Sequence, residues 1–228
     1  MKLRILFITS ILTLLAGCYN TKPSDNPDHQ LLDAAAKGEA GTIISLLQQG
    51  ANPEVFESRR GKTGYKRGWT PLIVASGKGH HDVVMTLLKN GAVVDAVAKS
   101  KKENALIIAS SFGFNEIVKT LIEAKANIEF RDYLDSTPIF MPAFEGHIDV
   151  LKTLIDAGAD VNAQSSINDA TALYLATIKS RTKTIEALLA AGAKTTIYMK
   201  GEEVSIVDEA KTRNRKDVLA IFKKYGYL

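Results

Sequence analysis

The sequence contains very little cysteine and no large excess of charge. Cys18 is the single cysteine among 228 residues, so no disulfide can form within the chain and the fold must be held by its packed core. The 29 basic residues exceed the 25 acidic residues by four. Without Lys2 and Arg4, which lie in a segment that we expect to be removed, 27 basic residues face 25 acidic ones, a net charge of +2. Such a balance does not indicate a nucleic acid partner.

The N-terminal segment MKLRILFITSILTLLAGC has the three parts of an export signal. A basic start is followed by an apolar run over residues 5–15 and then by small residues. The apolar run is too short for a membrane span, which needs about 20 residues. Its ending, Leu15-Ala16-Gly17-Cys18, resembles the lipobox of bacterial lipoproteins.

The lipobox resemblance implies that residues 1–17 are a signal peptide and that the Cys18 thiol carries diacylglycerol, with a further acyl chain on the new amino terminus. Several acyl chains hold a protein firmly on a bilayer. Residues 18–27 would then be the lipidated cysteine and a polar, flexible tether with two prolines. Tyr19 replaces the aspartate that marks inner-membrane retention, which favours the outer membrane, facing the periplasm. The alternative is a plain secretory signal that happens to end at Cys18.

Residues 28–228 contain a repeat of about 34 positions. Segments similar to Thr-Pro-Leu begin at Thr70, Thr137 and Thr171. Each is followed by a second apolar stretch that ends in Gly-Ala, at Gly91, Gly158 and Gly192. This period and motif resemble the ankyrin repeat. The resemblance implies an all-α repeat solenoid of helix-turn-helix units joined by β-hairpin loops, with about six units including the caps, because no unit can bury its apolar face alone.

Helix signals support the repeat, with two departures from it. Threonine is expected to cap each first helix, and the glycine after each second helix is expected to adopt the left-handed conformation. The third unit has Asn104-Ala105 in place of Thr-Pro, and Lys125-Ala126 in place of Gly-Ala. Pro142 falls inside the first helix of the fourth unit. We expect it to remove one hydrogen bond and kink the helix, at a cost of up to about 3 kcal/mol.

Catalytic patterns are scarce, and we predict that the chain is not an enzyme and holds no cofactor, metal or small-molecule substrate. Gly61-Lys62-Thr63 lacks the earlier glycine of a phosphate-binding loop, since Phe56 stands in its place. His80, His81, Asp82 and His147 could suggest a metal or hydrolase site. His80 and His147, however, occupy the Gly-His position of the repeat, where the imidazole bonds backbone between units.

The ankyrin resemblance places a protein partner on the hairpin tips and on the exposed ends of the first helices. The helix positions are Lys78, Phe112, Phe144, Ile178 and Arg213, and the hairpin positions include Lys66, Arg67, Trp69, Lys101, Tyr133, Leu134 and Ile167. Large side chains at successive units would form an apolar strip with a basic end. The alternative is that Phe112 or Phe144 folds inward.

An insertion near residues 54–67 makes the first hairpin about eight residues longer than its successors. It carries Arg59, Arg60, Lys66 and Arg67 beside aromatic residues. Such a basic finger would suit an acidic protein surface and speed association. Alternatively, it is a solvated loop whose charge lies near anionic lipid headgroups.

Together these patterns predict a lipid-anchored, protein-binding module of the bacterial cell envelope. A specific hypothesis is an inhibitor or immunity protein against a toxin that acts in the periplasm, such as a phospholipase effector of type VI secretion. The alternatives are an accessory protein that supports an envelope enzyme or oxidative-stress defence and, in another class, a hydrolase.

Overall fold

The computed structural model describes residues 26–56, 68–99, 101–166 and 169–228. The predicted signal peptide, Cys18 and most of the predicted tether lie outside these residues, as do Arg59, Arg60, Lys66, Arg67 and Ile167. Within them, no helix is long and apolar enough to cross a membrane.

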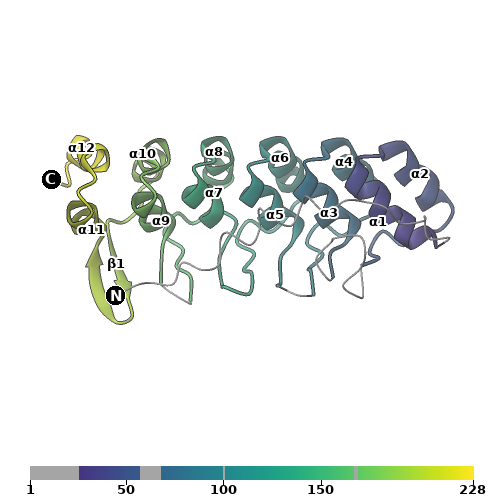
Figure 1. Cartoon of the computed structure of the whole chain (residues 1–228), viewed down its shortest axis with the longest axis horizontal. Coiled ribbons are helices and arrows are strands. Elements are labelled where there is room, and N and C mark those ends of the chain that lie inside the picture. The colour runs from purple at the N-terminus through teal and green to yellow at the C-terminus, as the bar shows by residue number, and fades with distance from the viewer. Residues whose placement is uncertain (1–25, 57–67, 100, 167–168) are drawn as a thin grey trace.

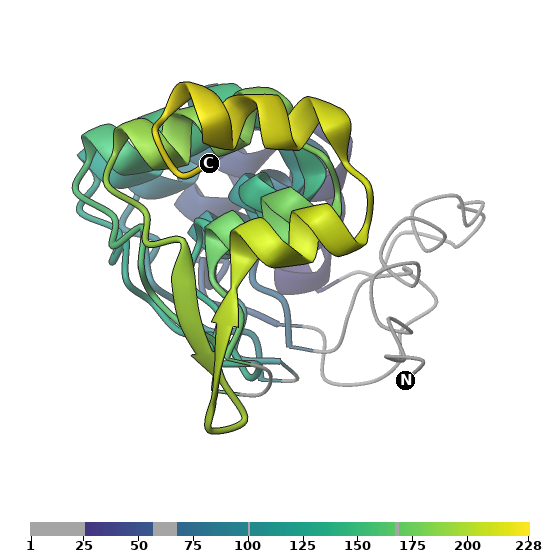
Figure 2. The ribbon, with the colours of Figure 1, turned by 90° about the vertical axis from the view of Figure 1, so that its left-hand side faces the viewer.

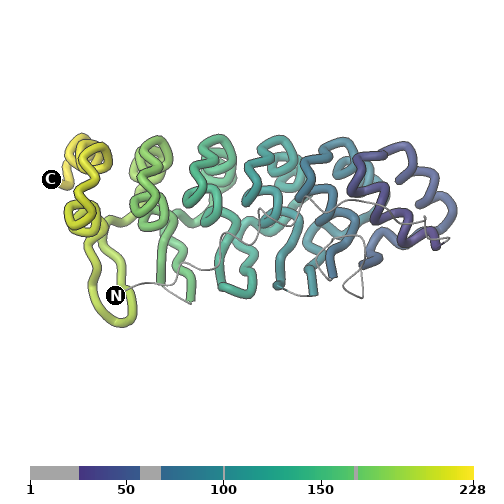
Figure 3. The backbone as a smooth tube through the Cα atoms, viewed as in Figure 1, coloured from purple at the N-terminus to yellow at the C-terminus, as the bar shows by residue number. Residues whose placement is uncertain are grey.

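Pairs of short antiparallel helices stack along one axis, with a loop hanging from the same side of each pair (Figures 1 and 3). The helices of the described chain are α1 (Pro27–Lys37), α2 (Ala40–Gln48), α3 (Pro71–Lys78), α4 (His81–Lys89), α5 (Ala105–Phe112), α6 (Asn115–Glu123), α7 (Phe140–Glu145), α8 (Ile148–Asp156), α9 (Ala172–Ile178), α10 (Thr182–Ala190), α11 (Ile206–Thr212) and α12 (Lys216–Lys224). Two short antiparallel strands, β1 (Thr196–Met199) and β2 (Glu202–Ser205), precede α11. The predicted all-α repeat solenoid of six units is confirmed, with one small sheet in its last loop.

The units pack in two layers. Odd-numbered helices contact one another in succession from α1 to α11, and even-numbered helices do the same from α2 to α12. Figure 2 shows the two layers end on, with the loops projecting from the odd-numbered layer. One continuous apolar core runs between the layers from Leu31 in the first unit to Phe222 in the last. Burial of these stacked faces is therefore the main source of stability.

The first helices begin at the predicted caps. The Thr70 and Thr171 hydroxyls accept hydrogen bonds from the backbone N–H three residues later, at 3.4 and 3.3 Å. Asn104, which departs from the repeat pattern, does the same more closely, with its Oδ1 2.9 Å from the Ile107 nitrogen. Because asparagine is as good a cap as threonine, the third unit keeps its helix start.

Pro142 does not kink its helix, so the sequence expectation was wrong on this point. α3 and α9 begin directly after their capping threonine, whereas α7 begins at Phe140, three residues after Thr137. The later start places Pro142 in the first turn of α7, where a backbone N–H has no partner within the helix. The unit thus loses the first part of a helix and avoids a broken one, and the buried Thr137 hydroxyl has no hydrogen-bond partner.

Left-handed residues end the helices, and those of the first helices form contacts between units. Gly38, Gly79, Gly113 and Gly146 end α1, α3, α5 and α7 at φ of 80°, 79°, 78° and 88°. Against each lies the residue that precedes the second helix of the next unit, namely His80, Phe114, His147 and Arg181. A Cβ on any of these glycines would come within 2.9 Å of that side chain. Glycine is required here both for its conformation and for close approach.

Polar bonds reinforce the same junctions. His80 Nε2 lies 2.9 Å from the Ala36 carbonyl oxygen, and this ring nitrogen donates because a carbonyl only accepts. The predicted backbone bond of the Gly-His position is therefore confirmed for His80. At a later junction Arg181 Nε donates to the Phe144 carbonyl at 3.0 Å.

The loops are also bonded from unit to unit. Glu54 Oε1 accepts the Val93 N–H, and Glu129 Oε1 accepts the Asp160 N–H, both at 2.8 Å. Asn162 Oδ1 accepts the Lys194 N–H at 2.8 Å. Side chains of one loop thus satisfy backbone donors of the next, which holds the row of loops in a fixed arrangement.

Candidate partner-binding groove

The odd-numbered helices and the loops meet at an angle (Figure 2). We name the surface on the inner side of this angle the groove, with the helices and the loops as its two walls. The side-chain to backbone hydrogen bonds described above join each loop to the next, and the packed core fixes the helices. A partner would therefore meet a surface that is already ordered, which lowers the entropic cost of binding.

The first helices of three successive units, α5, α7 and α9, each carry two side chains that are four residues apart on one face. Residues four apart share a face of a helix, which groups Ile107 with Ser111, Phe140 with Phe144, and Tyr174 with Ile178. Ser111 and Ile178 are half-buried, whereas Ile107, Phe140, Phe144 and Tyr174 are buried. We take this face of α5, α7 and α9, exposed only near the helix ends, as the helical wall of the groove.

Phe144 differs from the expectation of an exposed anchor, because it is only 3% exposed. It is nevertheless not part of the continuous core. The Lys179 Nζ lies 4.2 Å from the centroid of its ring, so a charged side chain covers it. Phe144 therefore lies outside the core but is covered by the Lys179 side chain, and its predicted exposure was wrong.

Trp69 is also buried, at 7% exposure, contrary to the prediction. A Cβ on Gly77 of α3 would lie 3.3 Å from Cζ3 of the indole. The missing side chain at position 77 thus makes room for Trp69 against the helix.

The predicted helix positions do not form one row. Lys78 and Phe112 directly precede the left-handed residue that ends their helix, whereas Phe144 and Ile178 lie one residue earlier. The residues equivalent to Lys78 are Phe112, Glu145, Lys179 and Arg213. The expected apolar strip with a basic end therefore does not follow this row, which contains one phenylalanine and four charged residues.

Of the remaining predicted residues, Lys78, Phe112 and Ile178 are half-buried. Phe112 stacks on Phe114, with 6.1 Å between ring centroids. Tyr133 is 41% exposed at a loop tip, and the Lys101 Nζ lies 5.3 Å from the centroid of its ring. These side chains come from four successive units and lie at the surface, as a binding face requires.

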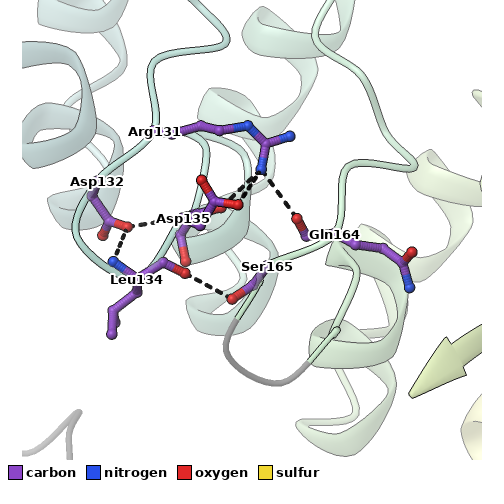
Figure 4. Close-up of polar contacts among 7 residues, drawn as sticks. Arg131, Asp132, Leu134, Asp135, Gln164 and Ser165 are labelled. Carbon is purple, nitrogen blue, oxygen red and sulfur yellow. Dashed lines mark hydrogen bonds and ion pairs between the residues drawn. The ribbon is translucent and has the colours of Figure 1, made fainter. Parts of the chain in front are cut away.

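Tyr133 belongs to a hydrogen-bonded loop that also holds the half-buried Leu134. Figure 4 shows the polar contacts around Leu134. Asp132 accepts the Leu134 N–H at 2.8 Å, and the Leu134 carbonyl accepts the Ser165 hydroxyl at 2.8 Å. Arg131 donates to the Asp135 carboxylate and to the Gln164 carbonyl, at 3.1 and 3.2 Å. Bonds to the next loop thus brace both sides of this tip.

Burial and hydrogen bonding have opposite effects on the pKa of Asp132 in this loop. Burial raises the pKa of Asp132 above its ordinary value, although hydrogen bonds from the Ser136 and Leu134 N–H groups favour the charged form. At the far end of the groove, burial likewise raises the pKa of Tyr174, whose neighbours include Glu209 and Arg213. Arg213 Nε donates to Glu209 at 2.6 Å.

Sequence reasoning missed the most exposed large side chain near the groove, Tyr198 on β1, which is 63% exposed. Its strand pairs with β2 across a Lys200-Gly201 turn, with Tyr198 opposite Glu203. The alternating stretches on both sides of that turn predict a two-residue hairpin, and this signal could have placed Tyr198 at its surface.

No group of three or more His, Cys, Asp or Glu side chains in the described ranges is arranged to hold a metal ion. The His81 ring instead lies 2.8 Å from the Thr120 hydroxyl of the next unit. His80, His81 and His147, which the sequence offered for chemistry, thus take part in contacts between units.

Comparison with known proteins gives one family. A family model described as ankyrin repeats, three copies, matches residues 31–132 and 92–165, more than half of the chain. The ankyrin repeat and KH domain-containing protein mask-1 of Caenorhabditis elegans is 31% identical over 176 residues, which are 77% of this chain and 6% of that protein. The related mask protein of Drosophila melanogaster is 35% identical over 106 residues, 46% of this chain and 3% of that protein.

A third relative, the probable E3 ubiquitin-protein ligase XBOS32 of Oryza sativa, is 27% identical over 127 residues, 55% of this chain and 24% of that protein. The chain thus spans only a small part of each of these relatives. The matched segments of these relatives are their ankyrin repeats.

Proposed function

Because the chain belongs to the ankyrin-repeat family, whose repeats are protein–protein interaction modules, we propose that it binds a protein partner in the groove described above. We further propose that it does so at the bacterial cell envelope, anchored by lipid on Cys18. The finer role that we propose is inhibition of a toxin that acts in the periplasm, such as a secreted phospholipase.

The observation that carries the binding proposal is a set of apolar and aromatic side chains at the surface of successive units. Phe112 and Ile178 lie half-buried at the ends of α5 and α9, and Tyr133 is exposed at the neighbouring loop tip. Large apolar and aromatic anchors at the centre of a surface, with charge at its edge, are what a specific interface requires. Loops bonded from unit to unit would present them without rearrangement.

The envelope and the toxin are supported by the sequence pattern around Cys18 and by a physical argument. A lipid anchor confines the module to the membrane surface and raises its concentration near any enzyme that works there. An inhibitor of a phospholipase would gain most from this placement, since its target must reach the same bilayer.

The proposal is tested by capture of the partner with the tagged, full-length chain from a bacterium that exchanges secreted toxins. We expect a secreted lipid-degrading enzyme among the captured proteins and inhibition of its activity by the chain. Changing Phe112, Tyr133 and Ile178 to serine should abolish capture. A matched variant with Ile44 and Val93 changed to serine, both exposed and in other units, should retain it.

Equal capture by the groove variant and by wild type would exclude the groove as the binding face. Capture of an envelope enzyme whose activity rises in the complex would replace inhibition by an accessory role. Membrane attachment is tested separately, because Cys18→Ser should move the chain from the membrane fraction to the soluble fraction. Continued attachment of that variant, with normal signal cleavage, would contradict lipidation.

A further inference from the structure

The turns between the two helices of the last two units concentrate positive charge. The turn between α9 and α10, with the start of α10, carries Lys179, Arg181 and Lys183. The turn between α11 and α12, with the adjoining helix ends, carries Lys211, Arg213, Arg215 and Lys216. We propose that these seven side chains, the basic rim, bind an acidic segment of a protein partner. This surface lies beside the groove and does not rest on the function proposed for it.

The two turns are neighbours in space. α9 packs on α11, and α10 packs on α12. Figure 2 shows the α11–α12 turn at the edge of the molecule opposite the loops, in line with the turns of the units behind it. The cations therefore lie along one edge, across adjacent units whose helix axes are about 8–10 Å apart.

The charge of the rim is only partly neutralised within the chain. Arg181 pairs with Glu145 at 3.6 Å, and two more rim cations pair with Asp208 and Glu209 of α11. Lys183, Arg215 and Lys216 form no ion pair in the described part of the chain. All three belong to exposed positions, so they can meet a partner without desolvating a buried group.

The rim departs from the pattern of the three units that precede it. The helix macrodipole favours acidic residues in the first turn, and α4, α6 and α8 each have one there, at Asp82, Glu116 and Asp149, whereas α2 has none. α10 has no acidic residue in its first turn, follows Arg181 as its cap residue, and carries Lys183 at its second position. α12 likewise follows an arginine cap residue and begins with a lysine, although Asp217 comes next.

Cations at helix starts reduce the stability of these helices, since the same end of the dipole is positive. A local conflict of this kind, complete in α10 and partly offset by Asp217 in α12, is typical of a functional surface. An anion that binds there would meet the cationic side chains and the helix dipoles together.

The distribution of charge favours a short acidic segment of a protein over a membrane. A flat anionic bilayer that touched the whole edge would also meet the carboxylates of Asp82, Glu116 and Asp149 at the equivalent turns. The densest cluster of cations lies in these two units, and three or four extended residues at about 3.3 Å each span the distance between them. A peptide with several neighbouring carboxylates fits this strip.

The test uses the full-length chain and a fluorescent oligo-glutamate peptide of about 12 residues, long enough to cross both units. Fluorescence anisotropy is measured at about 20 mM and about 200 mM salt, where screening differs strongly. The rim variant is Lys183→Gln, Arg215→Gln and Lys216→Gln. The control variant is Lys37→Gln, Lys89→Gln and Lys152→Gln, which removes the same charge from exposed positions in other units.

We expect wild type and control to bind the peptide alike at low salt and more weakly at high salt. The rim variant should bind about tenfold more weakly, since each exposed ion pair contributes little and three are lost. It should remain folded, because removing cations from helix starts stabilises the helices. Equal weakening in the control, or no difference between the rim variant and wild type, would overturn the proposal.

Vesicles of phosphatidylcholine with about 30 mol % phosphatidylglycerol serve as the second probe. Rim-dependent binding to these vesicles without binding to the peptide would assign the rim to a membrane and overturn the acidic segment as its ligand. Partner capture that depends on the groove alone would leave the rim result unaffected, so the two proposals fail separately.

Discussion

The contact between Gly113 and His147 provides the sharpest test of how adjacent units are locked together. Gly113 ends α5 at φ 78°, and an added Cβ would lie 2.8 Å from Nδ1, 2.9 Å from Cγ and 3.0 Å from Cε1 of the His147 ring. Three ring atoms at this distance leave no small rotation that relieves the contact. Gly113→Ala therefore combines two costs, a conformational one and a steric one.

The conformational cost of alanine in the left-handed region is about 1–2 kcal/mol. Overpacking against a neighbouring side chain adds about 1–2 kcal/mol. We therefore expect Gly113→Ala to lower the free energy of unfolding by about 2–4 kcal/mol. Gly158→Ala is the matched control, because Gly158 has φ 93° and a Cβ there would meet nothing within 4 Å.

Urea unfolding followed by far-ultraviolet circular dichroism measures both costs. Gly158→Ala should show only the conformational part, and Gly113→Ala should exceed it by about 1–2 kcal/mol. Adding His147→Ala to Gly113→Ala should remove that excess, which a double-mutant cycle reports as coupling. If the two glycine variants lost the same stability, the packing of each unit on the glycine of the previous one would not be a steric lock.

Other residues give independent predictions about stability. Burial raises the folded-state pKa of Asp132 above its ordinary value of 3.8. The folded state therefore binds more protons than the unfolded state above pH 3.8, and the free energy of unfolding falls as pH rises to the folded pKa. Asp132→Asn should flatten that fall in urea titrations at several pH values, and an unchanged dependence on pH would contradict the assignment. Asn104→Ala should lower the free energy of unfolding by about 1 kcal/mol through loss of its cap, whereas Thr137→Ala should be near neutral because that hydroxyl has no partner. Equal losses would show that the difference in capping between the third and fourth units does not affect stability. Pro142→Ala should change stability by less than about 1 kcal/mol, measured by the same unfolding experiment, and a gain near 3 kcal/mol would mean that the proline strains the helix after all.

The repeat, its caps and its order could be predicted because each rests on local chemistry. Threonine or asparagine before a helix and glycine after it act within a few residues, so their spacing in the sequence is also their spacing in the fold. Even Lys125 keeps the left-handed conformation of the glycine that it replaces, at φ 68°. The period alone therefore gives the solenoid.

The groove was predicted less well because its side chains depend on neighbours that are distant in the sequence. Trp69 is buried because position 77 is glycine, and Phe144 is covered because Lys179 of the next unit reaches its ring. Phe144 and Ile178 were predicted in the same row as Lys78, although each lies one residue earlier in its helix. For Ile178 the usual marker is missing, since Ser180 stands where earlier units have glycine. Exposure on a repeat surface thus depends on the pairing of units, which a single repeat does not reveal.

The locks between units also bear on binding. A partner that spans several units gains affinity only if those units already hold the same relative positions, since ordering them on binding would cost free energy. Here one set of contacts joins the turns at the helix ends, and a second set of side-chain to backbone bonds joins the loops. The groove lies between these two sets, so a change such as Gly113→Ala that loosens one of them should weaken partner binding without altering any side chain in the groove.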